Sequence, residues 1–353
     1  MSKVTTAIIG ASGYSGEELV RLLLNHPSAE LTAVTSRQYA GKTVGEIFPR
    51  FASHPKAKEL TFEEPDAWAL SKKAEVIFLA LPHGVAAEYA SDLLEQGCKV
   101  IDLSADFRLN DADTYQEFYH ADHPAPNLMA EAVYGLPEVY RDEIKNARLI
   151  ANPGCYPTTI LLPIIPLIKE GLIKPHGIIA NSLSSVTGAG RKVDLPYIFG
   201  EINESIRPYG IPKHRHLSEI EQELSIAAND KVVIQFSPHL MPINRGILST
   251  LYLAPAKFFS TDTEAAAIDA AIDACYDRYY ADEPFIRLLG TKGMPDTKNI
   301  AGTNYLEIAW QLDPRTGRLI VMSAEDNIVK GASGQAVQNL NVMCGFEETA
   351  GLV

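Results

Sequence analysis

The sequence predicts an α/β protein in which a Rossmann-type doubly wound parallel sheet is joined to an α+β domain with a mostly antiparallel or mixed sheet. Three observations predict this class. Short apolar runs alternate with helical segments up to Cys155, a glycine-rich turn follows the first run, and longer strand-like runs follow one another after Cys155. The length of 353 residues fits two domains of about 150 residues each.

The short runs of the first half are candidate buried strands because each is continuously apolar and ends in polar or turn residues. Between the first two runs, Leu19, Leu22 and Leu23 lie on one face of an expected helix. This alternation of strands and helices predicts a parallel sheet. The expected strands are 4–9, 31–35, 76–81, 100–103 and 149–151, and the expected helix is 17–25.

The second half has fewer helices between its apolar runs, which favours an antiparallel or mixed sheet. A helix is expected from Pro157 to Glu170, where Gly171 ends it, and a second one crosses the sheet at about 262–280. The chain closes with a helix in which Val337 and Leu340 share one side. The expected strands are 177–185, 231–236, 246–253, 304–312 and 319–323, and the last helix is 334–344.

Composition excludes several classes of partner. The formal net charge of −13 argues against non-specific binding to nucleic acid or to an anionic membrane. Every apolar stretch is shorter than the roughly 18 residues of a membrane span, and the N-terminus has no signal-peptide pattern. The four cysteines are far apart and none has metal-ligand spacing, so we expect reduced thiols, no metal site and a cytoplasmic protein.

Three glycines follow the first expected strand in the spacing Gly10-x-x-Gly13-x-x-Gly16 and open a helix. Glycines allow a tight turn and a close approach of the backbone to a pyrophosphate, and the helix N-terminus offers free N–H groups. The strand–turn–helix context predicts dinucleotide binding, against the alternative of a purely structural turn. The predicted cofactor-binding residues of this turn are Gly10, Ser12, Gly13, Tyr14, Ser15 and Gly16.

The end of the second expected strand indicates which dinucleotide is preferred. An NAD enzyme usually has an acidic residue there, to accept hydrogen bonds from the ribose 2′-hydroxyl. This chain has Ser36 and Arg37, with Lys42 close by, and a guanidinium attracts a 2′-phosphate. The sequence therefore favours NADP(H), although Arg37 as a solvated loop residue is the simpler alternative.

Cys155 lies between an expected strand and an expected helix. A thiol at a helix N-terminus is activated because the helix dipole stabilises the thiolate. Cys98, Cys275 and Cys344 lie in helical or apolar surroundings and are expected to be core residues. A nucleophilic thiol beside a nicotinamide suggests a thioester that is interconverted with a thiohemiacetal by hydride transfer.

Residues 152–158 (Asn-Pro-Gly-Cys-Tyr-Pro-Thr) resemble the active-site motif of the N-acetyl-γ-glutamyl-phosphate reductase family, a branch of the aspartate-semialdehyde dehydrogenase superfamily. The resemblance runs from residue 4 to about 345. The cysteine motif and the His214-Arg215-His216 segment are its specific parts, because typical aspartate-semialdehyde dehydrogenases have neither Tyr-Pro after the cysteine nor the His-Arg-His. Further matching segments are 10–16, 102–108, 134–138, 185–191 and 326–332.

The resemblance implies roles for individual residues. Cys155 would be the nucleophile and His216 the acid/base, with His214 in reserve for that role or as a substrate contact; His239 is a weaker candidate. Further cofactor contacts would come from Ser104, Gly188 and Asn327, in addition to Ser36 and Arg37. The remaining substrate contacts would come from Asn152 and from Arg108, Arg191 and Arg245, which the sequence does not rank as phosphate ligands.

In this superfamily the last segment returns to the cofactor domain. The implied domains are residues 1–154 plus 327–353 for NADP binding, and 155–326 for catalysis and oligomerisation as a homodimer or homotetramer. The implied reaction is the NADPH-dependent reductive dephosphorylation of N-acetyl-γ-glutamyl phosphate to the γ-semialdehyde, with release of phosphate, in arginine biosynthesis. Aspartyl phosphate and N-acetyl-aminoadipyl phosphate are alternative substrates, and a non-catalytic NADP-sensing protein is the alternative from another class.

Overall fold

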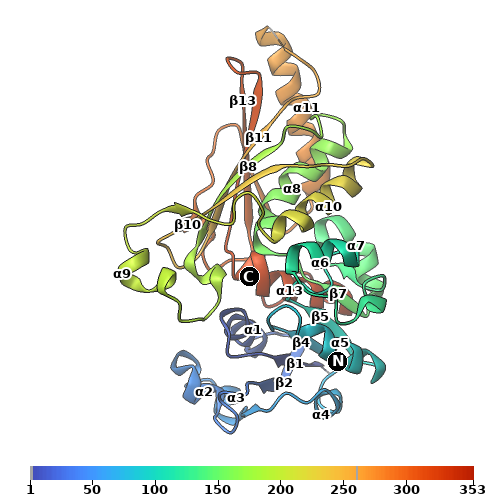
Figure 1. The fold of residues 1–353 in the computed structure, drawn as a ribbon, viewed down its shortest axis with the longest axis vertical. Helices are drawn as coiled ribbons and strands as arrows, with labels where there is room; N and C mark the ends of the chain where they lie inside the picture. Colours follow the sequence, from blue (N-terminus) through green and yellow to red (C-terminus); the bar gives the residue numbers. More distant parts are fainter. Residues whose placement is uncertain (1–2, 260) are drawn as a thin grey trace. The chain divides into compact units, whose positions relative to one another are not determined.

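The computed structural model describes residues 3–259 and 261–353, which form two compact units (Figure 1). The first unit runs to Gly154 and resumes at Ala332. The second unit is residues 155–331. Residues 327–331, which the sequence analysis assigns to the first domain, lie in the second unit.

The first unit contains a seven-stranded sheet in the order β3-β2-β1-β4-β5-β7-β6. Every paired strand is parallel to its neighbour, which confirms the predicted class. Its middle strand, β4, is apolar throughout and fully buried, as expected for a parallel sheet covered by helices. The strands are β1 Val4–Ile9, β2 Ala29–Thr35, β3 Phe62–Glu63, β4 Val76–Leu79, β5 Lys99–Asp102, β6 Val133–Tyr134 and β7 Leu149–Ala151.

Helices α4 and α5 pack on the strands through a shared apolar core that includes Ile9, Ile77 and Leu93. The last helix of the chain, α13, packs against α1 and α7 in the same unit. The helices are α1 Tyr14–Leu24, α2 Val44–Ile47, α3 Pro55–Glu59, α4 Ala67–Ser71, α5 Ala86–Glu95, α6 Ala112–Tyr119, α7 Pro137–Asn146 and α13 Gly334–Cys344, with 3₁₀ turns Pro49–Phe51 and Pro126–Leu128.

The second unit contains a mixed seven-stranded sheet in the order β12-β13-β14-β11-β8-β10-β9. The pairs β8–β10 and β12–β13 are parallel and the remaining pairs are antiparallel, in agreement with the predicted mixed sheet. The strands are β8 Ile179–Ser185, β9 Arg207–Pro208, β10 Gln235–Met241, β11 Ile247–Leu253, β12 Ile286–Gly290, β13 Leu306–Asp313 and β14 Arg318–Glu325.

Helices α8, α10 and α11 cover one face of this sheet (Figure 1). Helix α8 lies directly on β11 and β14 and is nearly all buried, so it is apolar on every side. The helices are α8 Cys155–Lys169, α9 Phe199–Ile202, α10 His216–Ala228, α11 Asp262–Tyr280 and α12 Thr297–Ile300, with 3₁₀ turns η3 Val186–Ala189 and η4 Leu195–Tyr197 and a π-turn η5 Val329–Ser333.

Helix α8 is uninterrupted although it contains two internal prolines, Pro163 and Pro166. Each proline lacks the N–H that would bond the carbonyl four residues earlier. Those two carbonyls find other donors: Ser323 Oγ donates to Thr159 O at 2.6 Å, and the Tyr280 hydroxyl donates to Leu162 O. The sheet and α11 therefore hold α8 in place, and with it the cysteine at its first position.

The predicted strand 231–236 is wrong over most of its length, because β10 begins only at Gln235. The preceding backbone bonds to side chains of α10 instead of to the sheet. Val232 N donates to Ser225 Oγ at 2.9 Å and Ile234 N to Glu221 Oε1 at 3.0 Å. The helices predicted at 262–280 and 334–344 are confirmed by α11 and α13. No helix in the described residues is long and apolar enough to cross a membrane.

Candidate active site

The glycine turn after β1 leaves a cradle at the start of α1. A Cβ on Gly10 would lie 2.4 Å from Ala80 O, and one on Gly16 would lie 2.4 Å from Gly10 O, so the turn itself requires both glycines. A Cβ on Gly13 would meet only Gly10 O, at 3.9 Å. Gly13 is the N-cap of α1 and places no side chain over the helix N-terminus. This open helix end fits a pyrophosphate.

Hydrogen bonds to the end of β2 and to the residue after it hold the turn in place. Ala11 N donates to Thr35 O at 3.0 Å, and Ser12 Oγ is 3.0 Å from Ser36 Oγ. Tyr14 and Ser15 form the first turn of α1 and are partly exposed. Arg37 is exposed just after β2, with its guanidinium 3.5 Å from the Tyr89 hydroxyl. A cation is thus available at the edge where a 2′-phosphate would lie.

Ser104 is buried in an acidic turn that follows β5. Its hydroxyl donates to Asp102 Oδ2 at 2.7 Å and its N–H donates to Asp102 Oδ1 at 2.8 Å. Burial, reinforced by the nearby Asp106, raises the pKa of Asp102 to about 7. Asp106 in turn accepts the Gly84 N–H at 2.6 Å and the Tyr115 hydroxyl at 3.0 Å. Ser104 therefore shapes the loops at the carboxyl ends of β4 and β5.

Arg108 and Asn152 are both buried and both bond within the first unit. The Arg108 guanidinium donates from Nε to Asn152 O and from a terminal nitrogen to Leu103 O, each at 2.8 Å. The Asn152 side-chain amide donates to Ala332 O at 3.1 Å. These contacts fix the segment that leads to Cys155.

Cys155 is the first residue of α8 and is partly exposed, as predicted for a thiol at a helix N-terminus. Within the second unit, Gly331 packs against it. A Cβ on Gly331 would lie 2.8 Å from Cys155 Cβ and 2.6 Å from Glu325 Oε1. Glu325, a fully buried acid at the end of β14, is not among the site residues predicted from the sequence. The predicted strand ends at Ser323, two residues before it.

The two histidines and Tyr156 form one aromatic cluster. The ring centroids of His214 and His216 are 5.1 Å apart, and they lie 5.5 and 5.9 Å from that of Tyr156. Since Tyr156 follows Cys155 in the chain, both imidazoles are gathered at the start of α8. The Tyr156 hydroxyl is 2.7 Å from the Tyr209 hydroxyl, another residue that the sequence analysis missed.

His214 and His216 differ in their hydrogen bonding. His214 Nδ1 accepts the backbone N–H of His216 at 3.1 Å, at the start of α10. Burial, with a smaller effect of Arg215, lowers the pKa of His214 to about 4. His214 is therefore neutral near pH 7, and its ring proton lies on Nε2 because Nδ1 is the acceptor. A neutral donor of this kind suits binding better than proton transfer.

Asn327 holds the turn that follows β8. Its Oδ1 accepts from Ser185 Oγ at 2.8 Å and from Gly246 N at 2.9 Å, while its Nδ2 donates to Thr187 Oγ1 at 3.0 Å. Gly188 lies above this amide, since a Cβ there would be 3.8 Å from Asn327 Nδ2. The predicted cofactor residues of the second unit are thus brought together in one loop cluster.

Two of the candidate phosphate ligands belong to the second unit. Arg245 pairs with the buried Asp326 at 3.2 Å and is itself partly exposed. Arg191 is exposed in the chain that follows η3. His239 points away from the site. On strand β10 it lies on the opposite face from Phe236, and the ring centroid of Phe236 is 5.6 Å from that of His214. Its Nδ1 lies 3.1 Å from Ser237 O.

Of the other cysteines, Cys98 and Cys275 are buried as predicted, whereas Cys344 at the end of α13 is partly exposed. In residues 3–259 and 261–353, no cluster of three or more His, Cys, Asp or Glu side chains has metal-binding geometry.

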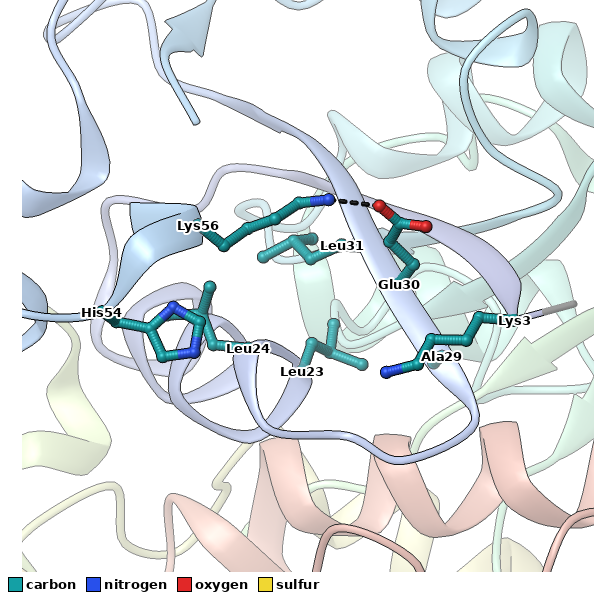
Figure 2. Close-up of a pocket in the computed structure, with 8 residues that line it drawn as sticks. All are labelled: Lys3, Leu23, Leu24, Ala29, Glu30, Leu31, His54 and Lys56. Atoms are coloured by element: carbon teal, nitrogen blue, oxygen red, sulfur yellow. Dashed lines mark hydrogen bonds and ion pairs between the residues drawn. The ribbon is translucent and has the colours of Figure 1, made fainter. Parts of the chain in front are cut away.

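A separate pocket of about 340 Å³ lies in the first unit, and Figure 2 shows the residues that line it. It lies at the end of the sheet where β2 begins, and the glycine turn is at the opposite, carboxyl end of β1. Lys56 pairs with Glu30 across it, and Lys3 Nζ donates to His26 O at 3.0 Å. We assign it no part in the candidate active site.

Two family models match the two units. Residues 5–147 match the semialdehyde dehydrogenase NAD-binding domain, and residues 155–327 match the semialdehyde dehydrogenase dimerisation domain. Aspartate semialdehyde dehydrogenase II from Vibrio cholerae, solved with ASA, has a TM-score of 0.73 at 16% identity, over 98% of this chain and 99% of that one. The enzyme from Candida albicans, solved with NADP, has a TM-score of 0.69 at 16% identity, over 97% and 99% of the two chains. The fold is that of the semialdehyde dehydrogenases.

Curated relatives identify the branch within this class. A protein from Akkermansia muciniphila is 54% identical over 353 residues, covering 100% of this chain and 99% of that protein. One from Desulfotalea psychrophila is 50% identical over 352 residues, covering 99% and 98%. Both are named N-acetyl-gamma-glutamyl-phosphate reductase. The chain belongs to the N-acetyl-gamma-glutamyl-phosphate reductase family, which confirms the resemblance drawn from the cysteine and histidine motifs.

Proposed function

We propose that this protein is an NADPH-dependent reductase that converts N-acetyl-γ-glutamyl phosphate to N-acetyl-glutamate γ-semialdehyde and phosphate in arginine biosynthesis. One observation carries the proposal: the chain is 54% identical, over its full length, to a relative of that name. The site supports it, because Cys155 opens α8 and two imidazoles gather around the next residue, Tyr156.

The first unit is proposed to bind NADP(H). The open N-terminus of α1 at Gly13 would hold the pyrophosphate, with Ser12, Tyr14 and Ser15 beside it. Ser36 and Arg37 would bind the adenosine ribose and its 2′-phosphate, because no acid follows β2 to repel it. Ser104 would support the neighbouring loops, and Gly188 and Asn327 of the second unit would contact the nicotinamide. When bound, NADPH supplies the hydride that reduces the acyl group.

Cys155 is proposed as the nucleophile. Its thiolate attacks the acyl carbon, the carbon–oxygen bond to phosphate breaks, and a thioester remains on the sulfur. After reduction, the C–S bond breaks, the aldehyde leaves and the thiolate is restored. The N-terminal position on α8 stabilises the sulfur as an anion both before attack and after release.

We assign the acid/base role to His216 and substrate binding to His214. Reduction places negative charge on the former carbonyl oxygen, and His216 would supply the proton that neutralises it and take the proton back when the C–S bond breaks and the carbonyl forms again. His214 is fitted to donate from Nε2 to a substrate oxygen, because its low pKa keeps it neutral across the working pH range.

The phosphate of the substrate needs cations that form several hydrogen bonds. Arg191 and Arg245 of the second unit and Arg108 of the first are the candidates. Arg108 already donates to two backbone carbonyls and Arg245 already pairs with Asp326, so each would bind phosphate from a fixed orientation. Arg191 is on an exposed loop and would be ordered by the substrate.

We further propose a cytoplasmic homodimer or homotetramer that assembles through the second unit. The sheet face opposite α8 and α10 has half-exposed apolar side chains, including Leu183, Leu248 and Tyr252. The matching family model is described as a dimerisation domain, which favours a second copy of this chain as the occupant. Analytical ultracentrifugation of the wild type and of Leu248→Asp tests this: the variant should dissociate. A monomeric wild type would overturn it.

The reaction is tested in the oxidative direction with NADP⁺, inorganic phosphate and three aldehydes: N-acetyl-glutamate, aspartate and N-acetyl-aminoadipate semialdehydes. We expect preferred turnover of the first, dependent on phosphate, and complete loss in Cys155→Ser with NADPH binding retained. Preference for another aldehyde would overturn the substrate assignment. NADPH binding without turnover of any aldehyde would favour the non-catalytic sensor instead.

A further inference from the structure

Asn152 is fixed by hydrogen bonds at both its backbone and its side chain. Its N–H donates to Asp102 O and its carbonyl accepts from Arg108 Nε, each at 2.8 Å. Its side-chain amide donates to Ala332 O at 3.1 Å, and its Oδ1 accepts from Asn339 Nδ2 at 3.1 Å. Asn152 is fully buried. This residue is therefore built into the first unit, and only Pro153 and Gly154 separate it from Cys155.

Asn339, in the middle of α13, is the side chain that reaches Asn152. Its Nδ2 donates both to Asn152 Oδ1 and to Gly135 O, the latter at 2.8 Å. A Cβ on Gly135 would lie 2.5 Å from this same nitrogen, so glycine is required there for the amide to fit. Asn339 Oδ1 is buried and lacks a hydrogen-bond partner in the described residues. The Asn339 side chain thus forms both hydrogen bonds through its Nδ2 donor, while its Oδ1 acceptor stays buried without one in the described residues.

We propose that Asn339 is a positioning residue for the nucleophile, acting through Asn152, and that Asn152 serves this role instead of contacting substrate. This inference rests on the proposed function. Three segments that carry the family resemblance, 134–138, 152–158 and 326–332, contribute Gly135, Asn152 and Ala332 to one hydrogen-bonded unit around this amide.

The physical reason lies in how the loop of the nucleophile is held. Pro153 and Gly154 have no side-chain hydrogen-bonding groups, so Asn152 is the last residue before Cys155 whose side chain anchors this segment. If Asn339 loses its amide, Asn152 Oδ1 and Gly135 O both lose a buried donor, and the loop relaxes toward other partners. A small displacement of the sulfur slows attack without changing the affinity of the cofactor.

Asn339→Leu tests the proposal, with Gln335→Met as the matched control. Gln335 is also a buried amide of α13 that donates to Gly135 O, at 3.1 Å, but no hydrogen bond joins it to Asn152 in the described residues. We expect kcat to fall about 10-fold in Asn339→Leu, with KM for NADPH unchanged, and to stay near wild type in Gln335→Met. Alkylation of Cys155 by iodoacetamide, without substrate or cofactor, should slow in Asn339→Leu alone.

A double-mutant cycle with Asn152→Ala completes the test. If Asn339 acts through Asn152, adding Asn339→Leu to Asn152→Ala causes little further loss. Equal effects of Asn339→Leu and Gln335→Met, or additive effects in the cycle, overturn the proposal. If Asn339→Leu fails to fold, Asn339→Ser, too short to reach Asn152 Oδ1, replaces it. The alkylation rates need no substrate, so they judge this inference even if the proposed reaction fails.

Discussion

Gly331→Ala is the sharpest test of how the second unit holds Cys155, the proposed nucleophile. The added Cβ would lie 2.8 Å from Cys155 Cβ and 2.6 Å from Glu325 Oε1. The backbone at Gly331 is outside the positive-φ region in which glycine is favoured, so the added methyl acts by its volume alone. Glu325 Oε1 is the far end of a flexible side chain, whereas Cys155 Cβ is attached directly to the backbone of α8.

The size of the effect follows from these distances. Ordinary contact begins at 3.4 Å, so Cys155 Cβ must retreat by about 0.6 Å. A misplacement of about 1 Å can lower the rate 10²-fold, and we therefore expect a roughly 10- to 20-fold fall in kcat. Forcing a methyl group into a packed site also destabilises the fold by about 1–3 kcal/mol.

The assay measures kcat in the oxidative direction, the iodoacetamide reaction of Cys155 and urea unfolding. Gly200→Ala, in α9 of the same unit, is the control because its Cβ would meet nothing within 4 Å. We expect that control to keep wild-type kcat and stability. Wild-type kcat and alkylation in Gly331→Ala would refute the reasoning, since the contact would then be absorbed without moving the sulfur.

Three further predictions concern the histidines, the cofactor and a buried acid. His216→Asn should lower kcat about 10²–10⁴-fold and remove a limb of its pH profile, whereas His214→Asn should mainly raise substrate KM; the reverse pattern would exchange their roles. Arg37→Asp should raise KM for NADPH far more than for NADH, and equal increases would contradict contact with the 2′-phosphate. Asp102 has a pKa raised from 3.8 to about 7, so the wild type loses stability as pH rises from about 4 to 7, where the unfolded chain ionises this acid and the folded protein does not. The stability of Asp102→Asn relative to wild type, from urea unfolding at pH 4 and 7, should therefore increase with pH.

The parts of the fold that follow from local pattern were predictable. Strand β1, the helices α11 and α13, and the glycine turn all have a periodicity or spacing that a short window of sequence contains. Strands β3, β6 and β9 were missed because each has only two residues, too few to show alternation. Their existence depends on neighbours in the sheet instead of on their own residues.

Helix α8 shows what tertiary contacts add. Its sequence contains two internal prolines, which by propensity alone argue for a break. The helix continues because a serine of β14 and a tyrosine of α11 bond the carbonyls that the prolines leave open. Those donors are more than 100 residues away in the chain, at separations of 164 and 118, so no local reading of α8 finds them.

The residues of the candidate site also fall into two groups, those that a local pattern indicates and those that only tertiary contacts reveal. Cys155, His214 and His216 could be proposed from motif and position, because their chemistry is carried by the residue type, and the structure brings the two histidines together around Tyr156. Glu325 was not found, since an acid at a strand end has no distinctive local pattern and becomes notable only when Gly331 brings it beside Cys155.

The two histidines are a case in which a backbone hydrogen bond affects the protonation of a side chain. The sequence leaves open which imidazole transfers the proton. In the structure, the N–H of His216 donates to His214 Nδ1, and this bond requires His214 to be neutral because a protonated ring has no acceptor nitrogen. The backbone bond at the start of α10 therefore argues against His214 as the acid/base. It supports the proposal that His216, and not His214, transfers the proton.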